Sequence, residues 1–354
     1  MRIVAAMSGG VDSSVVAGLL AEAGHEVIGV TLQLYDHGAA TGRRGACCAG
    51  QDIHDARDVA DRLGIPHYVV DAQARFAAAV IGDFADSYAA GRTPVPCVRC
   101  NMSVKFSDLL GMARDLGAEA MATGHYVRRV EGPNGPELHR ATDPGRDQSW
   151  FLFATTRDQL AFSHFPLGDM PDKTQVRAHA ARLGLTVAAK PDSQDLWFVP
   201  NASYVDVVAR LRPDAVASGE VVSRDGRVLG QHAGVARYTV GQNKALGTAS
   251  FDQGQRQAVL AMDAGTRRIV VGPRNAGSDQ VRLGEVNWLI DPLAAPLRCT
   301  VKLRAREMPH PAVVMATTAG AMVHLDGPTL AAPGQACVFY DGDRVLGGGF
   351  IQAG

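Results

Sequence analysis

The chain has 354 residues, of which 46% are hydrophobic and 20% charged, and its formal net charge is -1. This profile is typical of a folded, soluble protein, and the length predicts two or three domains. No apolar run in the sequence reaches the roughly 20 residues that span a bilayer, and the N-terminus lacks the features of a signal peptide. We therefore expect a cytoplasmic protein with no membrane association.

The first part of the chain alternates between strand-like and helix-like segments. Strands are expected at 2–6, 25–34, 67–70 and 118–122, and helices at 12–23, 51–63, 74–90, 105–116, 151–160 and 173–183. The Gly- and Ala-rich stretch at 36–50 is expected to form a loop. This alternation predicts an α/β fold with a doubly wound parallel sheet covered by helices.

Beyond about residue 200 the pattern changes to short apolar runs separated by Gly, Pro and Asp. Strand-like runs occur at 220–222, 237–240, 257–260, 268–271, 298–303, 312–314, 322–325 and 336–340. Short strands at this spacing predict a small β domain or barrel. We expect a catalytic domain at 1–200, a small central domain at 201–275 and a C-terminal β-barrel-like domain at 276–354.

The string SGGVDSS at residues 8–14 joins the first expected strand to the first helix. Its glycines let the backbone turn toward an anion, and its hydroxyls, N–H groups and helix N-terminus attract phosphate. Asp12 can help to hold a magnesium ion between phosphates. A plain helix cap also uses Ser and Asp, but the whole string is far more specific, and it lacks the ending of a Walker A loop. It resembles the PP-loop ATP pyrophosphatases, which cleave ATP between the α- and β-phosphates and adenylate a substrate oxygen.

Two cysteines, Cys97 and Cys100, stand in the segment GRTPVPCVRCN at 91–101, where the prolines stiffen the backbone. Cations nearby in the sequence could lower the pKa of a thiol and give a reactive thiolate: Arg92, Arg99 and Lys105. From the residues alone three interpretations stay open, namely half of a zinc site, part of an iron–sulfur cluster and a catalytic nucleophile. Cys299 and Cys337 lie in apolar, strand-like contexts and are expected in a core.

These two strings and several others together resemble one family along nearly the whole chain. The others are TGHYVR at 123–128, DQSWFL at 147–152, GLTVAAKPDSQD at 184–195, GRVLGQHAGVARYTVGQNKALG at 226–247 and PGQACVFYDGDRVLGGGFI at 333–351. The chain resembles the bacterial tRNA-specific 2-thiouridylases. The resemblance implies ATP-dependent adenylation of the C2 oxygen of the wobble uridine of tRNA, and then sulfur transfer from a cysteine persulfide with release of pyrophosphate and AMP.

The resemblance also implies roles for individual residues. Cys100 matches the family's nucleophile, and we expect Cys97 and Asp12 to complete the catalytic set. The expected ATP-binding residues are Ala6, Met7, Ser8, Gly9, Gly10, Val11, Asp12, Ser13, Leu32 and Gly124. The expected tRNA contacts are Val95, Pro96, Cys97, Arg146, Asp147, Gln148 and Arg304. The implied cofactors are ATP and Mg²⁺, and the implied partners are tRNA and a sulfur-donor protein, which is a cysteine desulfurase or a sulfur relay protein.

Local alternatives exist for some of these residues. Asp147 could merely cap a helix, and Lys190 and Asp192 could form a loop ion pair. Arg304 and Arg306 alternate along an expected strand, so that both would point to the same side and suit a phosphate-tracking face.

The chain departs from the family at Trp197, where better-known members carry a second cysteine. Tryptophan cannot carry a persulfide, so another thiol must replace it. We favour Cys97 as the replacement thiol, with Cys47 or Cys48 as the alternative. A further alternative is an iron–sulfur cluster bound by Cys97 and Cys100, with Cys47 or Cys48 as the third ligand. Two other functions stay open, namely a non-catalytic, ATP-gated tRNA-binding protein and another PP-loop ligase.

Overall fold

The structure is a computed structural model that describes residues 1–35, 48–192, 198–199, 203–252, 254–291 and 294–354. It divides into two compact units. Unit 1 comprises Met1–Ala79, Cys97–Pro200 and Asp343–Val345, and unit 2 comprises Val80–Pro96, Asn201–Gly342 and Leu346–Gly354. Within the described residues, no helix combines the length and the hydrophobicity that crossing a membrane requires.

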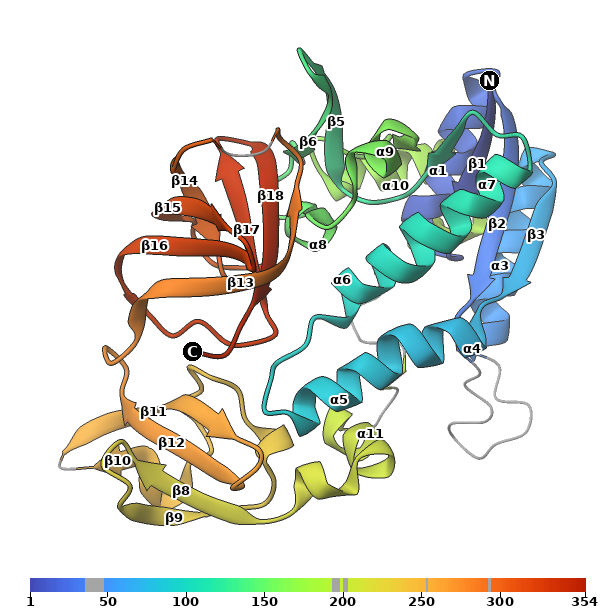
Figure 1. Ribbon diagram of the computed structural model, residues 1–354. Coiled ribbons are helices and arrows are strands. Elements are labelled where there is room, and N and C mark those ends of the chain that lie inside the picture. The colour runs from blue at the N-terminus through green and yellow to red at the C-terminus, as the bar shows by residue number, and fades with distance from the viewer. Residues whose placement is uncertain (36–47, 193–197, 200–202, 253, 292–293) are drawn as a thin grey trace. The chain divides into compact units, whose positions relative to one another are not determined.

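Unit 1 is built on a parallel sheet with the strand order β3-β2-β1-β4-β7. Figure 1 labels the first three of these strands. The strands of the sheet are β1 (Arg2–Ala6), β2 (Glu26–Gln33), β3 (His67–Asp71), β4 (Ala120–Ala122) and β7 (Ser163–His164). β1 is the central strand, and Ile3, Val4 and Ala5 are fully buried there. The order reverses at β1, since the chain builds β2 and β3 on one side of it and β4 and β7 on the other. The predicted doubly wound sheet is thereby confirmed.

Three helices share a hydrophobic core with Ile3 and Ala5 of β1. They are α1 (Val11–Glu22), α3 (Cys48–Leu63) and α10 (Lys173–Arg182). Small and β-branched residues face this core, among them Val15 and Val16 of α1 and Ala56 of α3, so the helices can approach the sheet closely. This packing fixes the start of α1 directly beyond the end of β1.

Two other helical stretches contain π-helical sections. The first runs through α4 (Gln73–Phe76), η1 (Ala77–Gly82) and α5 (Asp83–Ala89), which matches the expected helix at 74–90. The second runs through α6 (Pro96–Cys100), η2 (Asn101–Leu109) and α7 (Leu110–Asp115). It begins earlier than the expected 105–116 because Pro96 occupies the first helical position, where a missing N–H group costs nothing. Cys97 and Cys100 therefore lie on a helix.

The rest of unit 1 contains a hairpin that was not predicted from the sequence, and it corrects one expected helix. The charged stretch after β4 forms an antiparallel hairpin of β5 (Val127–Gly132) and β6 (Gly135–Arg140). The expected helix at 151–160 is two helices, α8 (Ser149–Leu152) and α9 (Arg157–Ala161), because Thr156 caps the second one with a capping box. A 3₁₀ turn, η3 (Thr186–Ala189), leads to Lys190.

Unit 2 contains a sheet with the strand order β10-β11-β12-β8-β9, which follows α11 (Tyr204–Leu211) and η4 (Pro213–Val216). The strands are β8 (Gly219–Ser223), β9 (Val228–His232), β10 (Phe251–Asp252), β11 (Gln255–Asp263) and β12 (Arg268–Pro273). The strand expected at 237–240 is wrong. Gly234 turns the chain at a φ of 112°, and η5 (Val235–Arg237) follows it as a short 3₁₀ helix. Another such helix, η6 (Gly247–Ser250), precedes β10.

The last strands of the chain close into a barrel, because β13 pairs with both β16 and β18. They are β13 (Ser278–Trp288), β14 (Leu297–Lys302), β15 (His310–Thr317), β16 (Gly320–Thr329), β17 (Ala336–Asp341) and β18 (Arg344–Ile351). Val301, Val314, Val323 and Phe339 fill its interior. Cys299 and Cys337 belong to this core, as predicted.

Candidate functional site

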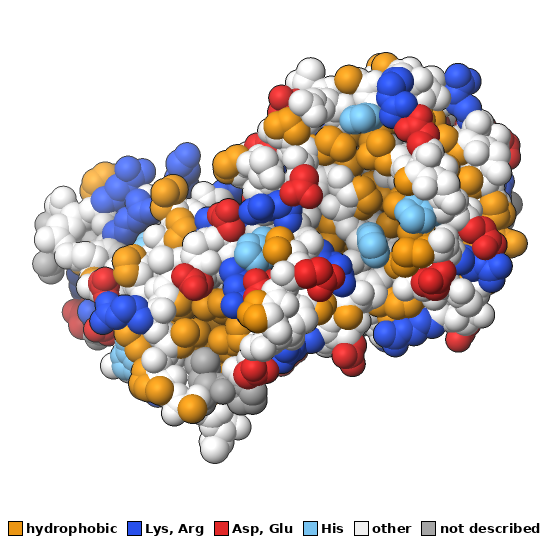
Figure 2. Space-filling model, turned by 90° about the horizontal axis from the view of Figure 1, so that it is seen from above, with side chains coloured by type: hydrophobic (Ala, Val, Ile, Leu, Met, Phe, Trp, Pro, Cys, Tyr) orange, Lys and Arg blue, Asp and Glu red, His pale blue; other side chains and the backbone are white. Residues whose placement is uncertain are grey.

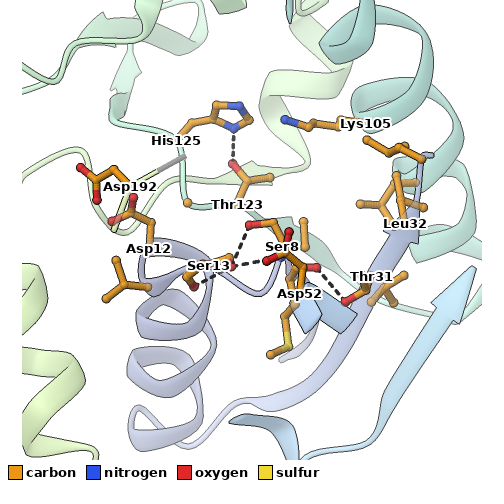
Figure 3. Close-up of a pocket in the computed structure, with 18 of the residues that line it drawn as sticks. Ser8, Asp12, Ser13, Thr31, Leu32, Asp52, Lys105, Thr123, His125 and Asp192 are labelled. Atoms are coloured by element: carbon orange, nitrogen blue, oxygen red, sulfur yellow. Dashed lines mark hydrogen bonds between the residues drawn. The ribbon is translucent and has the colours of Figure 1, made fainter. Parts of the chain in front are cut away.

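A cavity of about 330 Å³ opens where β1, β2 and β4 end. It is lined by the loop after β1, by residues 30–35 of β2 and its continuation, and by residues 123–126 after β4 (Figure 3). This is the place where the strand order of the sheet reverses. Open α/β sheets bind their ligands at such a point, because the loops on either side of it diverge.

The loop after β1 requires glycine at Gly9. This residue has a φ of 73°, and a Cβ atom placed on it would lie 2.1 Å from the carbonyl oxygen of Asp52. Ser13 ties the loop across itself, since its Oγ accepts a hydrogen bond from the Ser8 N–H at 3.1 Å and donates one to the Gly10 carbonyl at 3.2 Å. The first N–H groups of α1 have no acceptor within their own helix. The loop and the helix end thus form a rigid, positively polarised cradle for an anion.

The loop after β4 closes the other side of this cradle. A Cβ atom on Gly124 would lie 3.0 Å from the Ser13 nitrogen and 3.2 Å from the Asp12 Cβ, so glycine lets the two loops come together. The facing wall is apolar and consists of Val30, Leu32, Leu34, Ile53 and Leu109. An apolar wall beside an anion cradle suits a ligand with a flat base at one end and phosphates at the other.

Asp12 points from the start of α1 to a lysine far away in the sequence. Lys173 Nζ donates to both carboxylate oxygens of Asp12, at 2.6 and 2.7 Å, and the Tyr126 hydroxyl donates to Oδ1 at 2.6 Å. Burial raises the pKa of Tyr126, and the hydrogen bond to Asp12 raises it further, so this hydroxyl keeps its proton. Sequence reasoning found Asp12 but neither of its partners.

Asp192 is the second carboxylate at the cavity. It lies 2.9 Å from Lys173 Nζ, 2.6 Å from Arg146 Nη1 and 3.3 Å from Arg177 Nη2. Burial acts to raise the pKa of Asp192, but the bonds from Lys173 and Arg146 outweigh it and hold that pKa below its usual value. Asp192 is therefore a charged link between the cavity and the start of α10.

Lys190 connects the phosphate loop to α3. Its Nζ donates to the Gly9 carbonyl at 2.9 Å and to Asp52 Oδ1 at 2.6 Å, and it also pairs with Asp55. Burial acts to lower the pKa of Lys190, but its hydrogen bonds to Asp52 and Asp55 outweigh burial and raise this pKa. The alternative of a loop ion pair between Lys190 and Asp192 is wrong, because each residue has partners elsewhere and both line the cavity.

The two cysteines of α6 differ in exposure. Cys97 is exposed, Cys100 is 8% exposed, and neither is among the described residues that line the cavity. Burial raises the pKa of the Cys100 thiol, and Lys105 offsets this only in part. For Cys100 the prediction of a lowered thiol pKa is therefore wrong, because the nearby cation has less effect than the loss of solvent.

The question raised by Trp197 falls outside the described residues, as do Cys47 and the side chain of Cys48. Within the described part of the chain, no group of three or more His, Cys, Asp and Glu side chains is arranged to hold a metal ion. The iron–sulfur interpretation therefore has no support there.

The residues expected to contact tRNA lie in different places. Arg146 and Gln148 line the cavity, and Gln148 Oε1 accepts a hydrogen bond from the Tyr126 N–H at 2.9 Å. Asp147 accepts hydrogen bonds from the N–H and the hydroxyl of Ser149, both at 3.0 Å, at the start of α8. The N-cap residue of α8 is Gln148, so Asp147 binds the first helical N–H from the position before the cap. Val95 is buried, and Pro96 starts α6.

Arg304 does not lie on a strand. β14 ends at Lys302, and Arg304 and Arg306 lie in the turn that follows, so the predicted alternation of these arginines along a strand is wrong. The Arg304 guanidinium donates to the Leu330 carbonyl at 3.2 Å. On the face that Figure 2 shows, cations are interspersed with carboxylates.

The chain matches known families along its whole length. Residues 1–201 match the description "tRNA methyl transferase HUP domain", residues 206–273 "tRNA methyl transferase PRC-barrel domain" and residues 278–351 "Aminomethyltransferase beta-barrel domain". A protein of Acidiphilium cryptum named tRNA-specific 2-thiouridylase MnmA is 72% identical over 351 residues, which is 99% of this chain and 100% of that relative. A protein of the same name from Gluconobacter oxydans is 63% identical, over 100% of this chain and 99% of the relative.

Among solved structures, a 4-thiouridine synthetase in complex with RNA and ATP aligns with a TM-score of 0.38 and 17% identity. The alignment covers 60% of this chain and 50% of that one.

Proposed function

Because the chain belongs to the tRNA-specific 2-thiouridylase family, we propose that it uses ATP to exchange the C2 oxygen of the wobble uridine of tRNA for sulfur. The observation that carries this proposal is the cradle at residues 8–14, where Gly9 and Gly124 bring two loops around the N-terminus of α1. The cradle suits ATP, and the helical stretch that contributes Lys105 and Leu109 to the cavity begins with the segment that carries the two thiols needed for the second half of the reaction.

ATP binds with its phosphates against Ser8, Ser13 and the start of α1, and with its base along the wall that includes Leu32. The Asp12 carboxylate is the group that fits magnesium, because it is an oxygen donor on the rim of the phosphate cradle. Magnesium bound there would neutralise charge on the departing pyrophosphate. Lys173 lies beside Asp12 and adds a second positive charge at the same place.

The first step activates the uridine. Its C2 oxygen attacks the α-phosphorus, the bond to the β-phosphate breaks, and pyrophosphate leaves, while N3 of the uracil gives up its proton to solvent. The C2 oxygen is now part of an AMP leaving group. The base must leave the stack of the anticodon loop for this to happen, since C2 is otherwise out of reach.

The second step transfers sulfur from Cys100. The terminal sulfur of a Cys100 persulfide attacks C2, and AMP leaves with the oxygen, so that a disulfide joins the enzyme to the base. The Cys97 thiolate then attacks the Cys100 sulfur, and the electron pair of the broken bond stays on the sulfur at C2, where N3 regains a proton. A cellular thiol reduces the resulting Cys97–Cys100 disulfide. The pair has the C-x-x-C spacing of redox-active thiols, one helical turn apart.

The test is anaerobic thiolation of unmodified tRNA with ATP, Mg²⁺, cysteine and a cysteine desulfurase, read as 2-thiouridine by nucleoside mass spectrometry. We expect wild type and the matched control Cys299→Ser to turn over repeatedly, Cys100→Ser to give no product, and Cys97→Ser to stall as an enzyme–tRNA adduct. AMP release without any thiolated nucleoside would refute the proposal and favour another PP-loop ligase. Binding of tRNA without AMP release and without a thiolated nucleoside would favour a non-catalytic tRNA-binding protein. The iron content of each sample would reveal an iron–sulfur cluster.

A further inference from the structure

Three cationic side chains line the cavity within the described residues, and two of them are already neutralised. Arg146 is paired with Asp192, and Lys190 with Asp52 and Asp55. Lys105 is half-buried and pairs with no carboxylate of the described residues. A half-buried cation that faces a cavity without a protein counter-ion indicates an anionic ligand, since an unpaired charge is costly to remove from water.

The position of Lys105 follows from the π-helical section of its helix. Cys100 is the residue directly before η2, and the hydrogen bonds of a π-helix join residue i to residue i+5. Lys105 thus stands one π-helical turn beyond Cys100. In Figure 3 its side chain extends from the helix across the cavity toward His125. The same ammonium group therefore lines the cavity and acts electrostatically on the Cys100 thiol.

The other groups near Lys105 leave its charge available. Among the described residues, the titratable groups whose charge affects the Cys100 thiol are Lys105 on η2 and Cys97 on its own helix. His125, whose Nδ1 lies 2.9 Å from Thr123 Oγ1, faces Lys105 from the loop after β4. Burial lowers the pKa of His125 well below its ordinary value, with a smaller effect from Lys105, so this imidazole is neutral at physiological pH.

We propose that Lys105 is a catalytic residue that binds the α-phosphate of ATP and of the adenylated uridine, and that it stabilises AMP as the leaving group while it faces the attacking sulfur of Cys100. This inference rests on the proposed thiolation. Sulfur transfer brings an anionic persulfide toward a carbon that carries an anionic phosphate. A cation between the two anions lowers their repulsion and stabilises the negative charge that forms on AMP as the C2–O bond breaks. No proton needs to move to or from Lys105.

The experiment compares Lys105→Met, Lys105→Gln and Lys105→Arg with wild type, and uses Lys244→Met, an exposed lysine of unit 2, as the matched control. Binding of AMP is measured by calorimetry without tRNA. The alkylation rate of Cys100 against pH is measured by mass spectrometry in a Cys97→Ser background, and single-turnover thiolation is measured with tRNA. Thermal unfolding of each variant confirms the fold, and the Gln variant serves if the Met variant does not fold.

We expect the Met and Gln variants to bind AMP about tenfold or more weakly, since a hydrogen bond to a charged group is lost. Their single-turnover rate should fall by about 10²–10³-fold, and Cys100 should alkylate more slowly at neutral pH. The Arg variant should recover part of each loss, and Lys244→Met should match wild type. Unchanged AMP affinity together with unchanged Cys100 alkylation would overturn the proposal. If wild type forms no 2-thiouridine, the proposed function fails, while AMP binding and alkylation still decide the role of Lys105.

Discussion

Replacing Lys173 with methionine removes the cation that joins the phosphate loop to the start of α10. The Lys173 side chain is 11% exposed, and those of Asp12 and Asp192 are 31% and 18% exposed. Removing one partner from a buried ion pair costs about 3–5 kcal/mol. Asp12 keeps the Tyr126 hydroxyl and Asp192 keeps Arg146, so both carboxylates remain partly compensated. We expect the free energy of unfolding to fall by about 2 kcal/mol at pH 7.

The dependence of this loss on pH follows from Asp192. Burial acts to raise its pKa, but Lys173 and Arg146 outweigh burial and lower it in the folded state. A carboxylate with a lowered pKa stabilises the fold above its unfolded pKa of about 3.9, and this contribution is lost as the pH falls through the folded value. The difference between wild type and Lys173→Met should therefore be complete at pH 7 and shrink below about pH 4.

The assay is urea unfolding of both proteins between pH 3 and pH 7, followed by circular dichroism. Arg182→Met is the matched control, because Arg182 lies on the same helix and pairs with Glu22 at the surface, where the side chains are 51% and 43% exposed. Because water screens exposed charges, that pair should contribute much less to stability than the pair of Lys173 and Asp12. An equal effect of the two substitutions, or a Lys173→Met effect that does not change down to pH 3, would refute the reasoning.

Two further substitutions test the walls of the cavity. Gly124→Ala places a Cβ atom 3.0 Å from a backbone nitrogen of α1 and should weaken ATP binding by about tenfold in calorimetry. In the control Gly111→Ala the new Cβ atom meets no atom within 4 Å, so the affinity for ATP should not change. Equal effects of the two substitutions would contradict the crowding argument. Thr31→Val removes a buried hydroxyl that donates to the Met7 carbonyl at 2.7 Å and should lower the free energy of unfolding by about 2 kcal/mol in urea. The exposed Thr317→Val should stay within about 0.5 kcal/mol of wild type, and a similar loss in both would count against the buried bond.

Features that depend on neighbours in the sequence could be predicted. The loop at 8–14 and the helix after it follow from a local string of glycines, hydroxyls and apolar residues. The hairpin of β5 and β6 also had a local signal, Pro133-Asn134 between two glycines, which the surrounding charges obscured. A turn signal of this kind can define a hairpin even where the flanking strands are rich in charge.

Features that depend on distant residues could not be predicted from one sequence. Lys173 and Asp12 are 161 positions apart, and no local pattern marks Lys173 as a partner of the phosphate loop. The raised pKa of Cys100 reflects burial, which depends on packing and not on the nearby cations that the sequence displays. The π-helical section that carries Lys105 has no sequence signature that would separate it from an ordinary helix.

The pairing of Arg146 with Asp192 and of Lys190 with Asp52 affects which anions can occupy the cavity. A single inorganic phosphate must compete with carboxylates that these cations already hold, and it brings no base to cover the apolar wall. A nucleotide makes several contacts at once and gains binding free energy from burying its base, so it can displace these carboxylates from the cations. Internal ion pairs thus favour a ligand that makes several contacts over a small single anion, without any group that excludes the small anion by size.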